Sequence, residues 1–198
     1  MEKIGNSIEK PVVLVLSKKN YNALSIVRSL GRAGYIVDLL ADAYKEEASV
    51  VASRSKYLRS SKEIVIDKEE TDRDSILINA LIEYAKYEKK KVFLFPADDQ
   101  MFLLVDSNRN VLEPYFIMPF IVDGKEGEMA PLFDKSIQTK KAREAGLLTK
   151  REWLISLDKR VALSKDIIYP CFCELDSRAA GIKKDKKICE NAEELRRH

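Results

Sequence analysis

The feature that most constrains the fold is a continuous apolar run at residues 11–16, which is rich in β-branched side chains. Such a run is typical of a strand buried on both faces, as in a parallel sheet. Apolar residues then recur at the spacing of one helix face: Ala23, Ile26, Val27 and Leu30. A second apolar run at 35–40 completes a strand–helix–strand unit, whose crossover we expect to be right-handed.

The same alternation continues along the chain. We expect strands at 63–66 and 92–95, and helices at 74–89 and 100–108, where apolar residues follow helical spacing. This pattern predicts an α/β domain with a doubly wound parallel sheet over residues 11–125.

A second region is expected at residues 126–198, after a charged, glycine-bearing segment at 123–127 that predicts a linker. Its pattern indicates a helix at 135–145, strands at 153–155 and 167–175, and a helix from 192. Because so few strands rarely make an independent sheet, we expect part of a larger α+β domain. Such a part should expose apolar surface and favour self-association through this region.

Composition excludes several classes of protein. Hydrophobic residues make up 45% and charged residues 34% of the chain, which is ordinary for a globular protein. The net charge of +3 gives no argument for a nucleic-acid partner. No apolar stretch reaches the ~20 residues of a membrane span. The odd number of cysteines, 3, argues against a disulfide scaffold, so we expect a cytoplasmic protein.

Several kinds of catalytic site are also excluded. The single histidine is His198, so histidine-dependent triads and histidine-ligated zinc sites are not expected. The phosphate-binding loop of P-loop enzymes is absent. Gly31 and Gly34 lie at the end of the first expected helix rather than its start, so they form no dinucleotide fingerprint.

The cysteines permit two interpretations. Cys171 and Cys173 are two positions apart on an expected strand, so both face the same side. A metal or redox pair is conceivable, but three thiolates, with Cys189 included, fall short of a closed structural zinc site. Buried structural thiols are therefore the favoured interpretation, and we predict no metal ligands.

Two charged segments are candidate ligand-binding sites. Asp98 and Asp99 follow an expected strand, where doubly wound sheets bind ligands, and would face a substrate amine or a metal-bound water. Helix N-capping is the equally supported alternative, and the two roles can coexist. The lysine-rich run at 183–187 would bind phosphate, although such runs are more often exposed to solvent without a ligand.

The order of these segments resembles the pre-ATP-grasp domain and the opening of the ATP-grasp domain in carboxylate–amine ligases and carbamoyl-phosphate-synthase-like proteins. The resemblance covers about residues 11–197. It is carried by Asn22 with Ala23, by 28–34, 53–57, 95–99 and 134–136, by Gln138, Ala142, Gly146 and Leu147, and by 152–155, 169–177 and 191–195. It implies a Rossmann-like first domain followed by a partial ATP-grasp subdomain.

The resemblance also implies site residues. Asn22, Asp98 and Asp99 would border the substrate cleft, and Lys135 would contact ATP phosphate. The position that is usually a lysine is Glu174, whose charge would repel phosphate.

Two further departures concern the nucleotide site. The loop after Glu174 has one glycine, Gly181, where the family usually has several, so Lys183 or Lys184 would have to compensate. The family's magnesium-binding carboxylates and asparagine lie beyond the last residue of this chain.

We therefore expect the amino-terminal portion of an ATP-dependent ligase, not catalytically complete alone. The full family uses ATP and Mg²⁺ to join a small carboxylate to an amine through an acyl phosphate. The alternative is a non-catalytic binding or interaction module derived from such a protein. In either case we expect this chain to bind ATP weakly or not at all.

Overall fold

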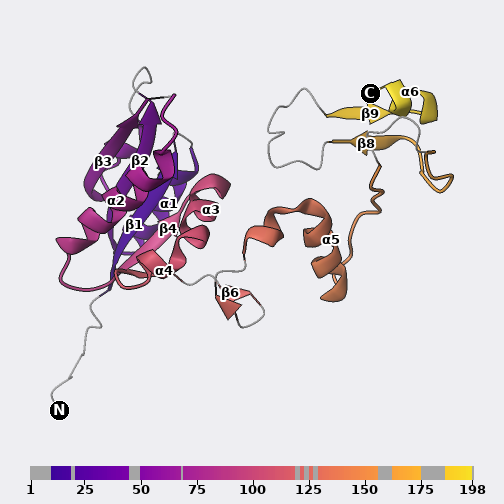
Figure 1. The fold of residues 1–198 in the computed structure, drawn as a ribbon. Coiled ribbons are helices and arrows are strands. Elements are labelled where there is room, and N and C mark those ends of the chain that lie inside the picture. Colours follow the sequence, from indigo (N-terminus) through magenta and orange to yellow (C-terminus); the bar gives the residue numbers. More distant parts are fainter. Residues whose placement is uncertain are drawn as a thin grey trace, which may run out of the picture. The chain divides into compact units, whose positions relative to one another are not determined.

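The computed structural model describes residues 10–18, 21–44, 50–67, 69–118, 121–122, 125–126, 129–155, 162–174 and 186–197. The chain forms two compact units, unit 1 at Met1–Ala130 and unit 2 at Pro131–His198 (Figure 1).

Unit 1 is built on a five-stranded sheet with the order β3-β2-β1-β4-β5 (Figure 1). Every neighbouring pair in this sheet is parallel. The strands are β1 Val12–Lys18, β2 Ile36–Tyr44, β3 Leu58–Ile66, β4 Val92–Pro96 and β5 Phe116–Ile117. The predicted parallel α/β sheet is confirmed.

Helices cover both faces of this sheet. They are α1 Asn22–Arg32, the 3₁₀ helix η1 Val51–Arg54, α2 Arg73–Lys86, α3 Asp99–Ser107 and α4 Arg109–Leu112. The chain steps from β1 outward to β2 and β3, and then returns to the other side of β1 for β4 and β5. Because parallel crossovers are right-handed, this reversal places α1 and η1 on one face and α2 and α3 on the other.

The core confirms that β1 is buried on both faces. Val13 and Val15 pack in one hydrophobic cluster with Val27 of α1, whereas Leu14 and Leu16 pack in a second cluster with residues of α2 and α3. Alternate side chains of a strand point to opposite faces, so β1 needs an apolar residue at every position.

Two carboxylates of β2, Asp38 and Asp42, are buried in the sheet beside the core. Asp38 of β2 is 1% exposed and accepts hydrogen bonds from Arg59, Ser60 and Tyr84. Burial raises the pKa of Asp38, but these hydrogen bonds outweigh burial and bring its pKa below the ordinary value. Arg59 also pairs with Glu88, so the network joins β2, β3 and the end of α2.

Unit 1 ends with a short antiparallel hairpin, β6 Ile121–Val122 and β7 Lys125–Glu126. The expected linker at 123–127 therefore contains a strand, because its lysine and glutamate pair with β6. Beyond the hairpin, the Asp106 carboxylate accepts hydrogen bonds from the main-chain nitrogens of Met129 and Ala130, at 3.2 and 3.3 Å.

Unit 2 contains α5 Lys135–Glu144, the antiparallel strands β8 Cys171–Cys173 and β9 Lys187–Cys189, and α6 Ala192–Arg197. A 3₁₀ helix, η2 Ala130–Phe133, precedes α5. Asp134 caps α5 by accepting hydrogen bonds from two main-chain nitrogens of its first turn. The helices predicted at 135–145 and from 192 are confirmed.

The strands expected in unit 2 are partly wrong. Residues 153–155 form no strand, and of 167–175 only Cys171–Cys173 is a strand, while Leu175 lies outside the described residues. Trp153 and Ile167 instead pack in a small cluster with Leu195 of α6. Apolar side chains here serve packing rather than strand pairing. Unit 2 also exposes the apolar surface expected of it, at Leu147, Leu148, Leu154, Phe172 and Ile188.

Candidate functional site

The candidate site in unit 1 lies where the carboxyl ends of β1 and β4 meet. These strands are neighbours in the sheet, and the chain leaves them toward opposite sides, β1 toward β2 and β4 toward β5. The helices that follow them, α1 and α3, pack in different hydrophobic clusters on opposite faces. Open α/β sheets bind ligands in a crevice at such a topological switch point, so we expect the crevice between these two connections.

Asp98 organises this edge of the sheet. Its Oδ1 atom accepts a hydrogen bond from the Met101 main-chain nitrogen at 3.1 Å, and its Oδ2 atom accepts one from the Lys18 main-chain nitrogen at 2.9 Å. The first bond caps α3, so the predicted N-cap role is confirmed. The second ties the end of β1 to the start of α3. Both oxygens therefore position backbone, and Asp98 shapes the crevice.

The other predicted substrate residues lie at the same edge. Asn22 is exposed at the start of α1, and its Nδ2 atom donates to the Ala97 carbonyl oxygen at 3.4 Å. Asp99 is exposed in the first turn of α3, where its negative charge also interacts favourably with the helix dipole. The structure thus brings Asn22, Asp98 and Asp99 together at the switch point.

Two polar residues of this edge were not predicted from the sequence. Lys18 is the last residue of β1, and its Nζ atom donates to the Gln100 Oε1 atom. A lysine ammonium has three donors, so one such bond leaves others for a ligand. The crevice therefore offers a cation at Lys18 and an anion at Asp99, which suits a small polar molecule with charges of both signs.

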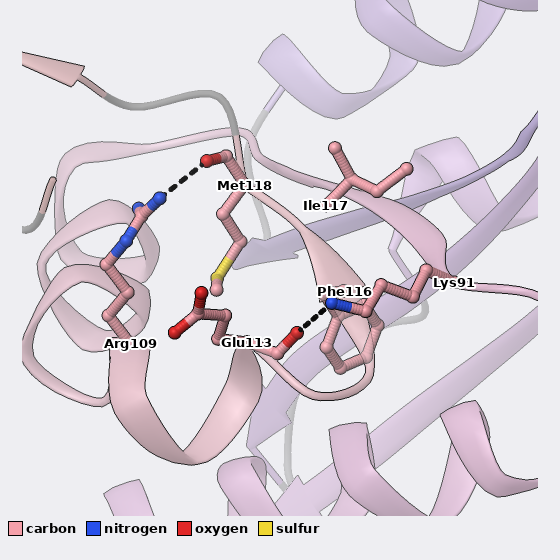
Figure 2. Close-up of a pocket in the computed structure, with 6 residues that line it drawn as sticks. All are labelled: Lys91, Arg109, Glu113, Phe116, Ile117 and Met118. Carbon is pink, nitrogen blue, oxygen red and sulfur yellow. Dashed lines mark hydrogen bonds between the residues drawn. The ribbon is translucent and has the colours of Figure 1, made fainter.

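A second concave surface lies near the other end of β4 (Figure 2). It has a volume of about 210 Å³ and is lined by Lys91, Arg109, Glu113, Phe116, Ile117 and Met118. The Lys91 ammonium donates to the Glu113 carbonyl oxygen and the Arg109 guanidinium to the Met118 carbonyl oxygen, both at 2.8 Å, as Figure 2 shows. The pocket is smaller than those that enclose metabolites, and its cations hold main-chain oxygens, so it is the weaker candidate.

Unit 2 carries a separate cluster of charged side chains. The Lys135 Nζ atom lies 2.6 Å from the Glu174 Oε2 atom, and the Lys186 Nζ atom lies 3.7 Å from the same oxygen. The Lys135 ammonium is the main reason that the pKa of Glu174 lies below its ordinary value. The residues predicted for ATP phosphate, Lys135 and Glu174, therefore meet each other, while Lys183 and Lys184 lie outside the described residues.

The fold explains why Lys135 and Lys186 lie beside Glu174. Glu174 directly follows β8 and Lys186 directly precedes β9, and the pairing of Cys173 with Lys187 places them across the hairpin from each other. Lys135 is the first residue of α5. Sequence reasoning did not single out Lys186, although the antiparallel pairing of its strand would have revealed it. Two ammonium groups and one carboxylate leave a net positive site that suits an anion.

The described ranges hold neither a metal-ligand cluster nor a membrane-spanning helix. Within them, no group of three or more His, Cys, Asp or Glu side chains is arranged to hold a metal ion. The described helices include none long and apolar enough to cross a membrane. No protein-family model matches the chain, and no curated protein matches it.

Proposed function

We propose that this chain is part of an ATP-dependent carboxylate–amine ligase of the ATP-grasp type. Unit 1 would bind the small-molecule substrate at the switch point, and unit 2 would contribute residues to the nucleotide site. The observation that carries the proposal is the convergence of Asn22, Lys18 and Asp99 at the carboxyl ends of β1 and β4. In this proposal Asp98 holds the crevice in shape and Asp99 receives the substrate amine.

ATP, when bound, would supply the phosphoryl group that activates the substrate carboxylate. In this chain Lys135 and Lys186 would hold its phosphate, because their ammonium groups already converge on one anionic oxygen. Glu174 does not fit a phosphate, since the two anions repel each other. Phosphate binding therefore requires Glu174 to leave Lys135, and we expect the affinity of this chain for ATP to be low.

The second candidate function is a binding or interaction module without catalysis. Two observations favour it: Glu174 neutralises Lys135, and unit 2 exposes large apolar side chains. Phe172 and Ile188 form a cross-strand pair on one face of the β8–β9 hairpin and are 61% and 60% exposed. Such a face favours association with another chain, including a second copy of this one.

The substrate crevice is tested by NMR titration with a panel of small carboxylates and amines. We expect the main-chain amide signals of Lys18, Asn22 and Gln100 to shift with ligands that bind. Asp99→Asn should weaken amine binding by about tenfold, ~1.4 kcal/mol. The matched control is Asp74→Asn, the same change in the first turn of α2, which follows the edge strand β3. Equal effects of the two variants would contradict the assignment.

The nucleotide half is tested separately by calorimetry with Mg-ATP. Glu174→Lys should tighten binding by at least about tenfold over the wild type. Glu152→Lys makes the same charge change in unit 2, at an exposed carboxylate that accepts a hydrogen bond from the Thr139 hydroxyl, so it serves as the control. Low-micromolar binding by the wild type would show that Glu174 does not obstruct phosphate. Absence of binding by Glu174→Lys would remove ATP from the proposal.

A further inference from the structure

We propose that Cys171 and Cys189 form a reversible disulfide across the β8–β9 hairpin. The reactant is a low-molecular-weight disulfide such as oxidised glutathione. The inference does not depend on the ligase proposal.

The geometry of the hairpin supports this pairing. Cys171 and Cys189 are directly opposite each other in the antiparallel register. Opposite residues in such a pair have Cα atoms about 4.5 or 5.5 Å apart, and both separations lie within the range that a disulfide spans, about 4.4–6.8 Å. The Cα separation therefore suits the bond, and the Cβ atoms of opposite residues, about 4.5–5.5 Å apart, must approach to reach the ~3.8 Å typical of a disulfide.

The third thiol lies beside this pair. Cys173 is two positions from Cys171 on β8 and so shares its face. Its thiol hydrogen-bonds with both the Cys171 thiol and the Cys189 thiol. Cys173 is therefore an alternative partner for either thiol, and the bond that forms on oxidation distinguishes the pairings.

The surroundings argue against the alternatives. The described residues contain no group of three or more His, Cys, Asp or Glu side chains arranged for a metal ion. A purely structural role was expected from the sequence, but only Cys189 is buried, whereas Cys171 and Cys173 are half-buried. Burial raises the pKa of Cys171, and of Cys173 to about 11, so both stay protonated and react slowly at neutral pH.

The exposure of each thiol sets the order of the steps. The thiolate of Cys171, which solvent reaches, attacks one sulfur of oxidised glutathione, and the first glutathione leaves as a thiolate. The buried Cys189 thiolate then attacks the Cys171 sulfur, which breaks the mixed disulfide and releases the second glutathione. Two protein thiols are oxidised, one disulfide is reduced to two thiols, and the protein's two protons pass to the two glutathione molecules.

The disulfide would link β8 to β9 at the register pair farthest from the connection between the two strands. Glu174 and Lys186 flank this connection directly beyond the two strands. Cross-linking the strands restricts how far their ends can move apart, most strongly near the bridge. Oxidation should therefore reduce the freedom of Glu174 to move away from Lys186.

The test equilibrates the full chain with glutathione redox buffers at pH 8.5, alkylates the remaining thiols, and maps linked peptides by mass spectrometry. We expect two fewer alkylated thiols, a Cys171–Cys189 linked peptide, and full reversal by a reductant. The equilibrium constant for forming this bond should be at least about tenfold larger in the folded chain than in the urea-unfolded chain.

The variants separate the roles of the three thiols. Cys173→Ser should still form the Cys171–Cys189 bond, whereas Cys171→Ser should not, although both remove one half-buried thiol from the same strand. Equal equilibrium constants for the folded and unfolded wild type would overturn the proposal without reliance on any variant. So would a wild-type product that contains only glutathione adducts, intermolecular dimers or a Cys171–Cys173 bond.

Discussion

Replacing Gly31 with alanine tests how closely α1 approaches the segment before β3. A Cβ atom added at Gly31 would lie 2.4 Å from the Tyr57 Cβ atom and 2.7 Å from its Cγ and Cδ1 atoms. Carbon atoms pack best about 3.5–4.0 Å apart. A Cβ atom is fixed to the backbone, so no change of the Tyr57 rotamer relieves the closest contact. The backbone of α1 or of the tyrosine must move instead.

Two opposing terms set the size of the effect. Overpacking a well-packed site costs about 1–3 kcal/mol, while replacing glycine with alanine inside a helix contributes about 1 kcal/mol in the stabilising direction. Because the closest contact falls roughly an ångström short of the preferred separation, we place the overpacking cost in the upper part of its range. Gly31→Ala should therefore lower the free energy of unfolding of unit 1 by about 1–2 kcal/mol.

The assay is urea denaturation followed through the NMR amide signals of Val13 to Leu16. These residues lie in β1, so their signals report the unfolding of unit 1 separately from that of unit 2. The sharp comparison is the Tyr57→Gly background, which removes the obstructing Cβ atom. There Gly31→Ala should stabilise unit 1 by up to about 1 kcal/mol, so the sign of the effect reverses. Ser29→Ala, at an exposed position of the same helix, should change stability by less than about 0.5 kcal/mol. If Gly31→Ala lowered the free energy of unfolding by the same amount with tyrosine and with glycine at position 57, the reasoning would be refuted.

Three further predictions concern stability, each measured by denaturation. Asp38→Asn should lower the free energy of unfolding by about 1–3 kcal/mol. The pKa of Asp38 in the folded chain lies below its unfolded value near 3.8, so its stabilisation is present above pH ~4 and is lost as pH falls through the folded pKa. The free energy of unfolding of the variant should therefore fall less steeply than that of the wild type as pH is lowered through this range. Leu14→Ala, at a residue with 0% exposure, should cost about 2–5 kcal/mol, whereas Val65→Ala, at 58% exposure, should cost less than about 0.5 kcal/mol. Gly146→Ala should destabilise unit 2 by about 1–2 kcal/mol through its φ of +76° alone, since its added Cβ meets nothing within 4 Å, and Gly146→Asn should cost less.

The sheet of unit 1 was predictable because buried parallel strands need apolar residues on both faces, as β1 shows. Two strands are exceptions: β5, Phe116–Ile117, was not expected, and β3 spans Leu58–Ile66 although only residues 63–66 were expected. Strand β3 lies at the edge of the sheet and pairs on one side only, so it tolerates polar residues. Arg59 and Ser60 also bind the buried carboxylate of Asp38, a contact across two strands that periodicity does not reveal.

The crevice was predictable in part for a similar reason. Asp98 and Asp99 follow a buried strand, and the rule for doubly wound sheets places such residues at the ligand-binding edge. Lys18 and Gln100 were not predicted, because they are 82 positions apart in the chain and meet only through the pairing of β1 with β4. Local sequence indicates which strand ends carry polar residues, whereas the strand order decides which ends become neighbours.

The structure changes how Glu174 is interpreted, compared with the interpretation that the sequence resemblance alone suggested. From the sequence, a glutamate in place of a lysine implied simple repulsion of phosphate. In the structure the carboxylate offsets the charge of Lys135, which is 45% exposed, and of Lys186, which is 48% exposed. Glu174 is itself 20% exposed, and each of its two ion pairs with an exposed lysine contributes about 0–1 kcal/mol. Displacing Glu174 would therefore weaken binding of a competing anion by up to about fivefold for each pair. A triphosphate carries several charges and can offset that cost, so Glu174 alone should tune phosphate affinity rather than abolish it.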